Sequence, residues 1–468
     1  MDTNVIRREY HGEYGAECHG ECHKEYGGQY RGEYKVPGGK LVAVTVGTGG
    51  INWADRGDWA IGAAGADGVD GTDGAVGTDA AARRRHVRID GDFFVESASD
   101  TQSDALLHDI ERVLSGIQAV PSAALAGSAA AMEGAGVVRD IAAAIAEAIA
   151  RHPDVCLVGT DAEAIAMAYV RAVGIPPATG VDVVASVSRP GASSTAPSTP
   201  TSATPAQPTE SDDFDERWAR LWPQLAVVHD VPRSPAEQMA VDERWAREVA
   251  SGLRRPTLRI WEWNAPCVVV GRFQSIRDEV HEDVARAEGI TVVRRCTGGG
   301  AMFIEPGNTI TYSLYTPLEF VAGLPVEASY RLCDRWLVEA LRGLGLDVRF
   351  AGLNDIASQH GKIGGAAQRR FPASRASAPT ADGVRAVPAE RTSSPGAVLH
   401  HVTMAYDIDA AKMGRVLNVS REKMRDKAVR SAVKRVDPLK TQTGMTRDML
   451  VAHLLDHCVS RGARLVAV

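Results

Sequence analysis

The stretch RRCTGGGA at residues 294–301 is the most informative part of the chain. It follows residues 289–295, whose β-branched content predicts a strand, so two arginines lead directly into three glycines. Glycine lets the backbone bring N–H groups close to an anion, and an adjacent arginine fork suits a carboxylate or a phosphate. A hairpin turn that merely needs glycine is the alternative, but the flanking arginines favour an anion-binding loop. The stretch is not a Walker loop, since no Gly-Lys-Ser/Thr follows, and its spacing does not fit the dinucleotide fingerprint.

A second motif, GKIGGA at residues 361–366, follows Asn354 and Asp355. Its Lys362 lies among small residues, which would let the side-chain stem lie close to the backbone while the ammonium faces a pocket. A lone lysine is more often a solvated surface charge, so this motif by itself indicates a functional role only weakly. Asp355 would suit a magnesium site, and Asn354 would suit a hydrogen bond to a substrate.

A third motif places His400 and His401 directly before residues 403–407, which are expected to form a strand. Neighbouring residues of a strand point to opposite faces, so these histidines are not expected to bind one metal together. A core or hydrogen-bonding role is the better expectation for at least one of them.

The residues around these motifs predict a mixed α+β domain. Its first helix starts at Ser234, where Pro235 and Glu237 complete the signature of a capping box, and runs to about Ala250. Further strands are expected at residues 258–263, 268–270 and 309–315, and further helices at 326–343 and from Met413.

Composition limits the class of protein. The 468 residues suit two or three domains, and 44 % hydrophobic with 24 % charged residues suit a soluble globular chain. A net charge of −7 gives no reason to expect nucleic-acid binding. There is no apolar run of about 18 residues to span a membrane, and the first residues lack the apolar core of a secretory signal. A cytoplasmic protein is expected, and the odd total of seven cysteines favours free thiols.

Composition also divides the chain into regions. They are a low-complexity tail (1–31), a small α+β module (32–176, with a flexible insertion at 48–83), a flexible linker (177–213) and a larger domain (214–468, with a flexible insertion at 370–397). The tail repeats Glu-Tyr-Gly units and has too few aliphatic residues to build a core. In the module, strands are expected at 40–46 and 86–90, and helices at 104–114, 137–150 and 161–173.

The tail contains the segment CHGECH at residues 18–23. Its cysteines and histidines would supply soft ligands to a zinc ion. A disordered tail with incidental ligands is the alternative, and it is favoured. Stoichiometric zinc that disappears when residues 1–31 are removed would reverse that preference.

Taken together, the motifs resemble the lipoate–protein ligase A family of the biotin/lipoate protein ligase superfamily. The resemblance rests on RRCTGGGAMF with Gly307-Asn308-Thr309, NDI with GKIGGAAQ, LHHVTMAYDID, and WEWNAPCVVVGRFQ, and it extends to Val436. EYKVPGGKLV, from Glu33, and IDGDFF, from Ile89, resemble the family's accessory domain, which usually follows the catalytic domain or is a separate chain. The resemblance implies an α+β fold, with a biotin/lipoate-ligase-like mixed sheet and helices, preceded here by the small α+β accessory domain.

The same resemblance implies ATP-dependent activation of lipoate to lipoyl-adenylate, followed by transfer to a specific lysine of a carrier domain. Expected carriers are the lipoyl domains of 2-oxoacid dehydrogenase complexes or the glycine-cleavage H protein; neither nucleic acid nor a membrane is an expected partner. ATP and Mg²⁺ are the expected cofactors. Lys362 would be catalytic, stabilising charge on the lipoate carboxyl and the α-phosphate, and Asp355 would assist the metal ion.

Further roles are implied for the residues that match the family's motifs. ATP would be bound by Arg295, Gly300, Ala301, Met302, Phe303 and Lys362. Substrate would be bound by Arg295, Gly299, Asn308, Asn354, Lys362 and His401. An apolar slot for the lipoate tail is expected from Val270, Val293 and Leu314. The chain departs from the family's pattern at Ile304, at Val402 and in the insertion from Arg370.

An octanoyltransferase of the same superfamily is the main alternative, and it needs a cysteine nucleophile. Such relatives place that cysteine shortly before the lysine motif or after the histidine strand, and residues 347–362 and 407–424 contain none. Cys296 remains a candidate, although it lies in the anion loop. A biotin ligase would carry a Gly-Arg-Gly type of loop, which is absent. A non-catalytic binding module is the third class, and unchanged acylation by a Lys362→Ala variant would favour it over an enzyme.

Overall fold

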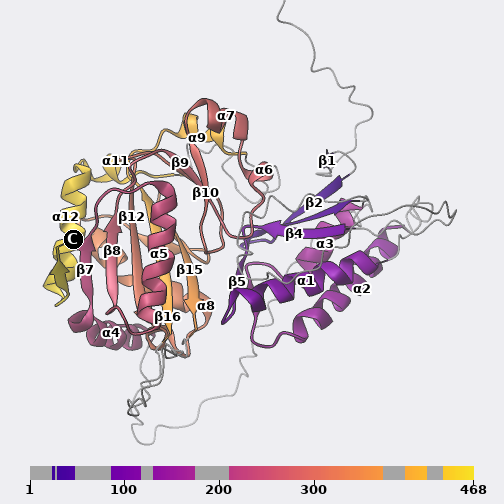
Figure 1. Ribbon diagram of the computed structural model, residues 1–468, viewed down its shortest axis with the longest axis horizontal. Helices are drawn as coiled ribbons and strands as arrows, with labels where there is room; N and C mark the ends of the chain where they lie inside the picture. The colour runs from indigo at the N-terminus through magenta and orange to yellow at the C-terminus, as the bar shows by residue number, and fades with distance from the viewer. Residues whose placement is uncertain are drawn as a thin grey trace, which may run out of the picture.

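The computed structural model describes residues 24–26, 29–47, 86–117, 130–173, 210–372, 396–418 and 436–467. They form two α+β units side by side, the N-terminal unit (24–173) and the C-terminal unit (210–467) (Figure 1). The CHGECH segment, the first insertion, and most of the linker and of the second insertion lie outside the described residues. No helix in these ranges is long and apolar enough to cross a membrane.

The N-terminal unit is a four-stranded antiparallel sheet in the order β1-β2-β3-β4, with helices packed against it (Figure 1). Its core joins Val42, Val44 and Ile89 of the sheet to Ile110 and Ile145 of the helices. The elements are β1 (Lys24–Tyr26), β2 (Gln29–Lys35), β3 (Leu41–Gly47), β4 (His86–Gly91), β5 (Phe94–Glu96), α1 (Asp100–Gly116), α2 (Ala130–Ala150), β6 (Cys156–Val158) and α3 (Ala162–Ala172). The two predicted strands and three predicted helices are confirmed, although α1 and α2 start earlier than their apolar spacing indicates.

The prediction that residues 1–31 build no core is wrong for their end, where β2 begins. Arg31 is buried there, and its guanidinium pairs with the carboxylate of Asp90 at 2.6 Å. Gly32 lets α3 lie directly on the strand, because a Cβ atom at this position would come 2.1 Å from the carbonyl oxygen of Ala168. The Arg31–Asp90 ion pair and the close contact at Gly32 therefore pack this part of the strand without the aliphatic side chains that a core was expected to need.

The C-terminal unit is built on an eight-stranded mixed sheet in the order β13-β14-β15-β16-β12-β8-β7-β17. One core joins the sheet to Trp218 of α4, Trp336 of α8 and Leu454 of α12. A separate core joins Trp245 of α5 to Leu399 of β16. The strands are β7 (Ala226–His229), β8 (Thr257–Trp261), β12 (Thr309–Pro317), β13 (Arg349–Ala351), β14 (Asp355–Ala357), β15 (Lys362–Phe371), β16 (Ala397–Ala405) and β17 (Arg464–Val466). The helices are α4 (Glu210–Leu221), η3 (Trp222–Gln224), α5 (Pro235–Ala250), η4 (Leu318–Val321), α8 (Val326–Gly343), α11 (Leu439–Thr443) and α12 (Arg447–Ser460).

A second, three-stranded sheet in the order β10-β9-β11 carries the glycine loop. The elements are β9 (Cys267–Val270), α6 (Ile276–Glu279), α7 (Glu282–Ala287), β10 (Thr291–Arg294), β11 (Met302–Ile304) and α9 (Ala410–Val416). Val268 and Val270 pack toward the short helices, whereas Val269 packs with Trp261 of the main sheet. The loop between β10 and β11 is therefore held beside the main sheet.

The predicted elements of the larger domain are confirmed, including the capping box at Ser234, although the helix expected from Met413 begins at Ala410. The sequence pattern did not indicate strands β7, β11, β13, β14, β15 and β17. GKIGGAAQ forms most of β15, which pairs with β16, and β16 starts well before the predicted residues 403–407. Glycine is depleted in strands because it gives little to pack. Here Gly365 leaves room for Lys362, since a Cβ atom would come 2.6 Å from that ammonium nitrogen.

Backbone, aromatic and charged contacts join the two units. The N–H of Gly91 donates to the carbonyl oxygen of Phe273 at 3.0 Å, and the ring of Phe93 stacks on that of Phe273 with centroids 5.3 Å apart. Arg272 pairs with Asp104 at 3.0 Å. The N-terminal unit is thus attached at the segment that follows β9, close to the glycine loop.

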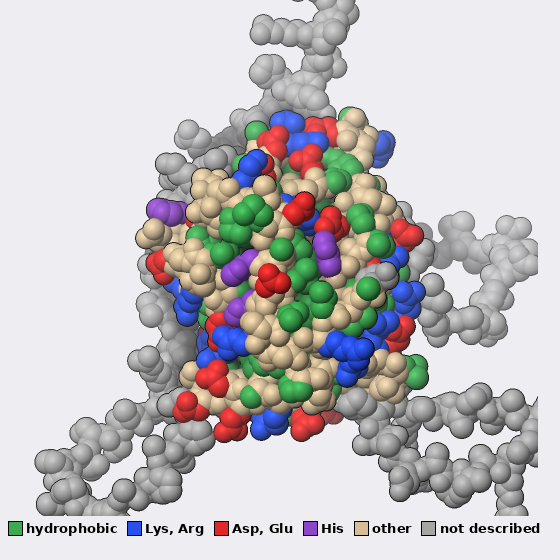
Figure 2. All heavy atoms as spheres, turned by 90° about the vertical axis from the view of Figure 1, so that its left-hand side faces the viewer, with side chains coloured by type: hydrophobic (Ala, Val, Ile, Leu, Met, Phe, Trp, Pro, Cys, Tyr) green, Lys and Arg blue, Asp and Glu red, His purple; other side chains and the backbone are tan. Residues whose placement is uncertain are grey.

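Acidic and basic side chains are interspersed with hydrophobic ones over the side of the C-terminal unit that Figure 2 shows. No large patch of one charge is visible on that face (Figure 2).

Candidate active site

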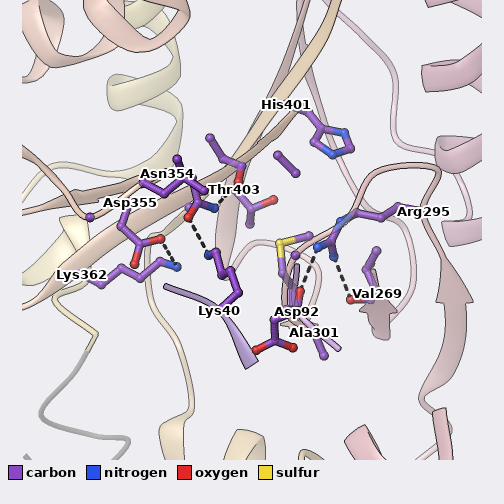
Figure 3. A pocket seen from close by; sticks show the side chains of 18 of the residues that line it. Lys40, Asp92, Val269, Arg295, Ala301, Asn354, Asp355, Lys362, His401 and Thr403 are labelled. Atoms are coloured by element: carbon purple, nitrogen blue, oxygen red, sulfur yellow. Dashed lines mark hydrogen bonds and ion pairs between the residues drawn. The ribbon is translucent and has the colours of Figure 1, made fainter. Parts of the chain in front are cut away.

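A cavity of about 460 Å³ lies between the two units, and both contribute to its walls (Figure 3). One group of lining residues is apolar and consists of Met239, Trp261, Trp263, Val269 and Met302. A second group is charged or polar and includes Lys35, Lys40, Asp92, Asn354, Asp355 and Lys362. The cavity therefore suits a ligand that has both an apolar part and an anionic part.

The buried guanidinium of Arg295 holds the glycine loop together. It donates to the carbonyl oxygens of Gly298 at 2.6 Å and Gly300 at 3.0 Å, and burial lowers its pKa to about 10. At Gly299, where φ is +95°, a Cβ atom would come 2.9 Å from Nη2 of Arg295. Arg295 also lines the cavity, but the loop uses most of its donors. It would therefore act on a ligand chiefly through the loop that it shapes.

Two of the three glycines also allow the units to meet. A Cβ atom at Gly298 would come 2.5 Å from the carbonyl oxygen of Phe93, and one at Gly299 would come 3.2 Å from the ring of Phe94. At Gly300 the nearest atom, which belongs to Asp92, would be 3.8 Å away. The sequence predicted that these glycines let an anion approach the loop. The structure shows that Gly298 and Gly299 also let the N-terminal unit pack against the loop.

His401 lines the cavity, but protein groups hold both of its ring nitrogens. Nδ1 lies 2.6 Å from Asp242 and Nε2 lies 2.8 Å from the hydroxyl of Thr297. Burial alone would raise the pKa of Asp242, yet the hydrogen bond and charge of His401 lower it. The ionised carboxylate can only accept, so Nδ1 of His401 donates to Asp242, and Nε2 makes the second hydrogen bond with the hydroxyl of Thr297. His401 thus links β16 to the glycine loop, and its contact with substrate stays a prediction.

Lys362 and Asp355 lie together on neighbouring strands at the cavity wall (Figure 3). The ammonium of Lys362 is 2.7 Å from the carboxylate of Asp355, and the lysine side chain is 45 % exposed. The carboxylate therefore orients the lysine along the cavity wall, while almost half of the lysine side chain stays open to solvent. Its catalytic role stays a prediction.

Lys40, for which the sequence motifs predicted no role, enters the same cavity from the N-terminal unit. It lies between β2 and β3, and its ammonium donates to the side-chain oxygen of Asn354 at 2.7 Å (Figure 3). The same ammonium lies 5.2 Å from the ring centroid of Phe94. The KVPGGKLV motif was the only sequence feature that could have pointed to Lys40. Its partner, Asn354, lies 314 positions away in the chain, so no local pattern could predict that they meet.

Two predicted site residues lie outside the cavity lining. Phe303 is buried in the cluster that contains Val268. Asn308 is buried in the turn after β11, where its side-chain oxygen accepts the N–H of Glu305 at 2.9 Å. Any effect of these two residues on binding would therefore act through the position of β11 or β12.

The residues expected to form the apolar slot do not line it: Val270, Val293 and Leu314. Alternation along the strand explains the error for β9, since Val269 faces the cavity and Val270 faces the opposite side. Ile304 and Val402, where the chain departs from the family's pattern, are also buried away from the lining.

None of the cysteines in the described part of the chain lines this cavity. Cys296 lies in a separate small pocket at the interface of the two units. Burial raises its pKa to about 11, and the thiolate is the nucleophilic form of cysteine. Cys296 is therefore poorly suited to nucleophilic catalysis at neutral pH.

Asp92 and Asp355 are the carboxylates in the cavity lining. Mg²⁺ is commonly bound by one or two carboxylates together with substrate phosphates, so these residues fit an ion that arrives with a nucleotide. Within the described ranges, no group of three or more His, Cys, Asp or Glu side chains is placed to hold a metal by itself.

Comparison with known proteins matches residues 234–378 to the model of the lipoyl protein ligase A/B catalytic domain. Curated relatives include an octanoyltransferase LipM of Kyrpidia tusciae, 31 % identical and covering 38 % of this chain and 64 % of the relative. A probable lipoate-protein ligase A of Mycoplasma pneumoniae is 30 % identical, with coverage of 40 % and 48 %. Lipoate-protein ligase A subunit 1 of Thermoplasma acidophilum is 29 % identical, with coverage of 39 % and 63 %.

Among solved structures, a bi-partite lipoate protein ligase studied with its E2 lipoyl domain from Thermoplasma acidophilum is 25 % identical. It has a TM-score of 0.41 and covers 52 % of this chain and 87 % of that one. The catalytic-domain match places residues 234–378 in the biotin/lipoate protein ligase superfamily, as the motifs predict. The chain covers less than two thirds of the length of the three curated relatives named above.

Proposed function

We propose that this protein is an ATP-dependent lipoate–protein ligase. The observation that carries the proposal is the cavity, in which an apolar group of residues lies beside Lys40, Lys362 and the glycine loop. Lipoate has an apolar tail and a carboxylate, and ATP adds phosphates, so each group of lining residues has a partner in the substrates.

The reaction proceeds in two steps. A carboxylate and an ammonium do not react, so one carboxylate oxygen of lipoate first attacks the α-phosphorus of ATP. The bond from that phosphorus to the bridging oxygen breaks, and pyrophosphate leaves with the electron pair. Lys362 stabilises the charge that develops. Asp355 and Asp92 would hold a Mg²⁺ ion, which would supply further positive charge to the site. The amine of a carrier lysine then attacks the acyl carbon and AMP leaves.

The N-terminal unit acts as the accessory domain in this proposal. Its contacts at Phe273 and Arg272 support closure over the cavity within one chain. Closure excludes water, which would otherwise hydrolyse the adenylate. The linker proposed at 177–213 would permit opening and closing, although its last residues, 210–213, belong to α4.

An octanoyltransferase remains the second candidate, because relatives with that name match as well as those named ligase. The absence of a described cysteine from the cavity lining supports the ligase. Lipoyl domains of 2-oxoacid dehydrogenase complexes and the glycine-cleavage H protein are the proposed carriers.

The two candidates differ in whether ATP is required. An apo lipoyl domain is incubated with the protein, Mg²⁺ and lipoate, with and without ATP, and its mass is measured. A parallel reaction contains octanoyl-carrier protein and no ATP. We expect a lipoyl mass increase only when ATP is present, whereas octanoylation without ATP would contradict the proposal.

A further inference from the structure

The ammonium of Lys40 lies at the cavity beside residues of the C-terminal unit, although the backbone of Lys40 belongs to the N-terminal unit. It is held between the side-chain oxygen of Asn354, at 2.7 Å, and the face of the Phe94 ring, at 5.2 Å. Neither neighbour carries a negative charge. Figure 3 shows Lys40 reaching toward the segment that carries Asn354, Asp355 and Lys362.

Several contacts fix the backbone that presents Lys40. Its N–H donates to the carbonyl oxygen of Gly159 at 2.7 Å. Gly159 has φ +83°, and a Cβ atom there would come 2.4 Å from Cγ of Lys40. On the other side, Asn354 is held because its amide nitrogen donates to the carbonyl oxygen of Ala366 at 2.5 Å. Both Lys40 and its hydrogen-bond partner are therefore prepositioned.

The charges around Lys40 indicate what the cavity binds. Asp355, the carboxylate that most favours the charge of Lys40, is already paired with Lys362 at 2.7 Å. The pKa of Lys40 is lowered to about 8, chiefly by burial; Asp355 and Asp92 favour its charge, and Lys362 and Lys35 oppose it. Lys40 and Lys362 are two cations in the wall of one cavity, each opposing the charge of the other, and an anion bound between them would relieve that repulsion.

We propose that Lys40 is a catalytic residue of the adenylation step, supplied to the active site by the N-terminal unit. This inference rests on the ligase function proposed above. Lys40 holds oxygens of the ATP phosphates while the lipoate carboxylate bonds to the α-phosphorus and the pyrophosphate departs. Lys362 and Lys40 then neutralise the pentacovalent phosphorus from two sides, one on each unit. The catalytic domain by itself therefore has an incomplete site.

The second step has less need of Lys40. Attack of the carrier amine on the acyl carbon releases AMP, which carries less negative charge than ATP and requires no departure of pyrophosphate. Removal of the Lys40 ammonium should therefore slow adenylate formation much more than acyl transfer. A residue that only joined the two units would affect both steps alike.

The test measures the two steps separately in full-length protein. Adenylation is followed by pyrophosphate release from ATP and lipoate, and transfer by acylation of an apo lipoyl domain from synthetic lipoyl-AMP. The variants are Lys40→Met, which keeps the stem and removes the charge, and Lys40→Arg, which keeps a cation. Lys440→Ala is the matched control, because that lysine is exposed and paired with Asp407 outside the cavity.

Lys40→Met should reduce the rate of adenylation by about 100-fold and change transfer by less than about threefold. Lys40→Arg should recover part of the adenylation rate, and Lys440→Ala should match the wild type. Equal rates in Lys40→Met and wild type, or an equal loss in both steps, would overturn the role of Lys40. If the wild type forms no adenylate, the ligase function itself fails and the inference falls with it.

Discussion

Two glycine-rich segments of this chain, residues 298–300 and residues 361–365, have similar compositions and different structures. The first is a loop held by the guanidinium of Arg295, and the second begins β15, one of the central strands of the main sheet. In each, a glycine leaves space for a cation, namely Arg295 beside Gly299 and Lys362 beside Gly365. Glycine therefore marks a close approach in both segments, and backbone pairing decides whether the segment is a loop or a strand.

The largest expected effect is at the lysine of the second segment. Lys362→Ala should reduce adenylate formation by about 100- to 1,000-fold, because it removes the cation proposed to meet the α-phosphate. Pyrophosphate release measures the effect, and a far-ultraviolet circular dichroism spectrum like that of the wild type checks that the variant folds. Activity within twofold of the wild type would show that the β15 segment is only structural.

An intermediate effect is expected in the first segment. Gly298→Ala places a Cβ atom 2.5 Å from the carbonyl oxygen of Phe93, and a backbone atom has little room to move. We expect a destabilisation of about 1–3 kcal/mol, measured by denaturant unfolding, together with weaker association of the two units.

Gly300→Ala is the matched control for that change, since the nearest atom to its Cβ would be 3.8 Å away. Its stability should stay within about 0.5 kcal/mol of the wild type. Equal destabilisation by the two substitutions would contradict the reading that Gly298 serves the contact between units.

The smallest expected effect is a change with pH. The pKa of Lys40 is lowered to about 8 by burial, with Lys362 and Lys35 opposing its charge and Asp355 and Asp92 favouring it. Because an anionic nucleotide binds the charged form, affinity falls as pH rises through about 8, whereas an ordinary lysine stays charged to about 10. The KM for ATP should therefore rise between about pH 7 and 9.

Lys40→Arg supplies the control for the pH dependence. The guanidinium stays charged between about pH 7 and 9, so the KM of this variant for ATP should be nearly constant. The same rise in KM in both proteins would assign the pH dependence to another group.

Much of the fold could be predicted from the sequence because the signals are local. The capping box at Ser234 and the apolar spacing of residues 326–343 each lie within one element, and both are confirmed. β15 was not predicted because glycine is rare in strands. Its glycines are needed for pairing with β16 and for the space that neighbouring side chains occupy, and neither requirement appears in the local sequence.

The candidate site could be predicted in part, for a similar reason. Gly299, Gly300, Ala301 and Met302 of the first motif and Asn354, Asp355 and Lys362 of the second do meet at one cavity. The apolar lining was assigned to the wrong residues, because a shift of one position along β9 exchanges Val270 for Val269. Such a shift becomes visible only when the strand has neighbours on both faces.

The sequence by itself determined the kinds of chemical group and their order along the chain: a glycine loop after two arginines, a lysine among glycines, and the motifs of a second module. Tertiary structure alone decided that Lys40 of that module reaches Asn354, since their approach depends on contacts at Gly159, Phe94 and the interface. It also decided that Arg295 and His401 serve the loop as well as the cavity. The physical reason is that residue type fixes what a side chain can bond to, whereas packing between distant segments fixes which partner it meets.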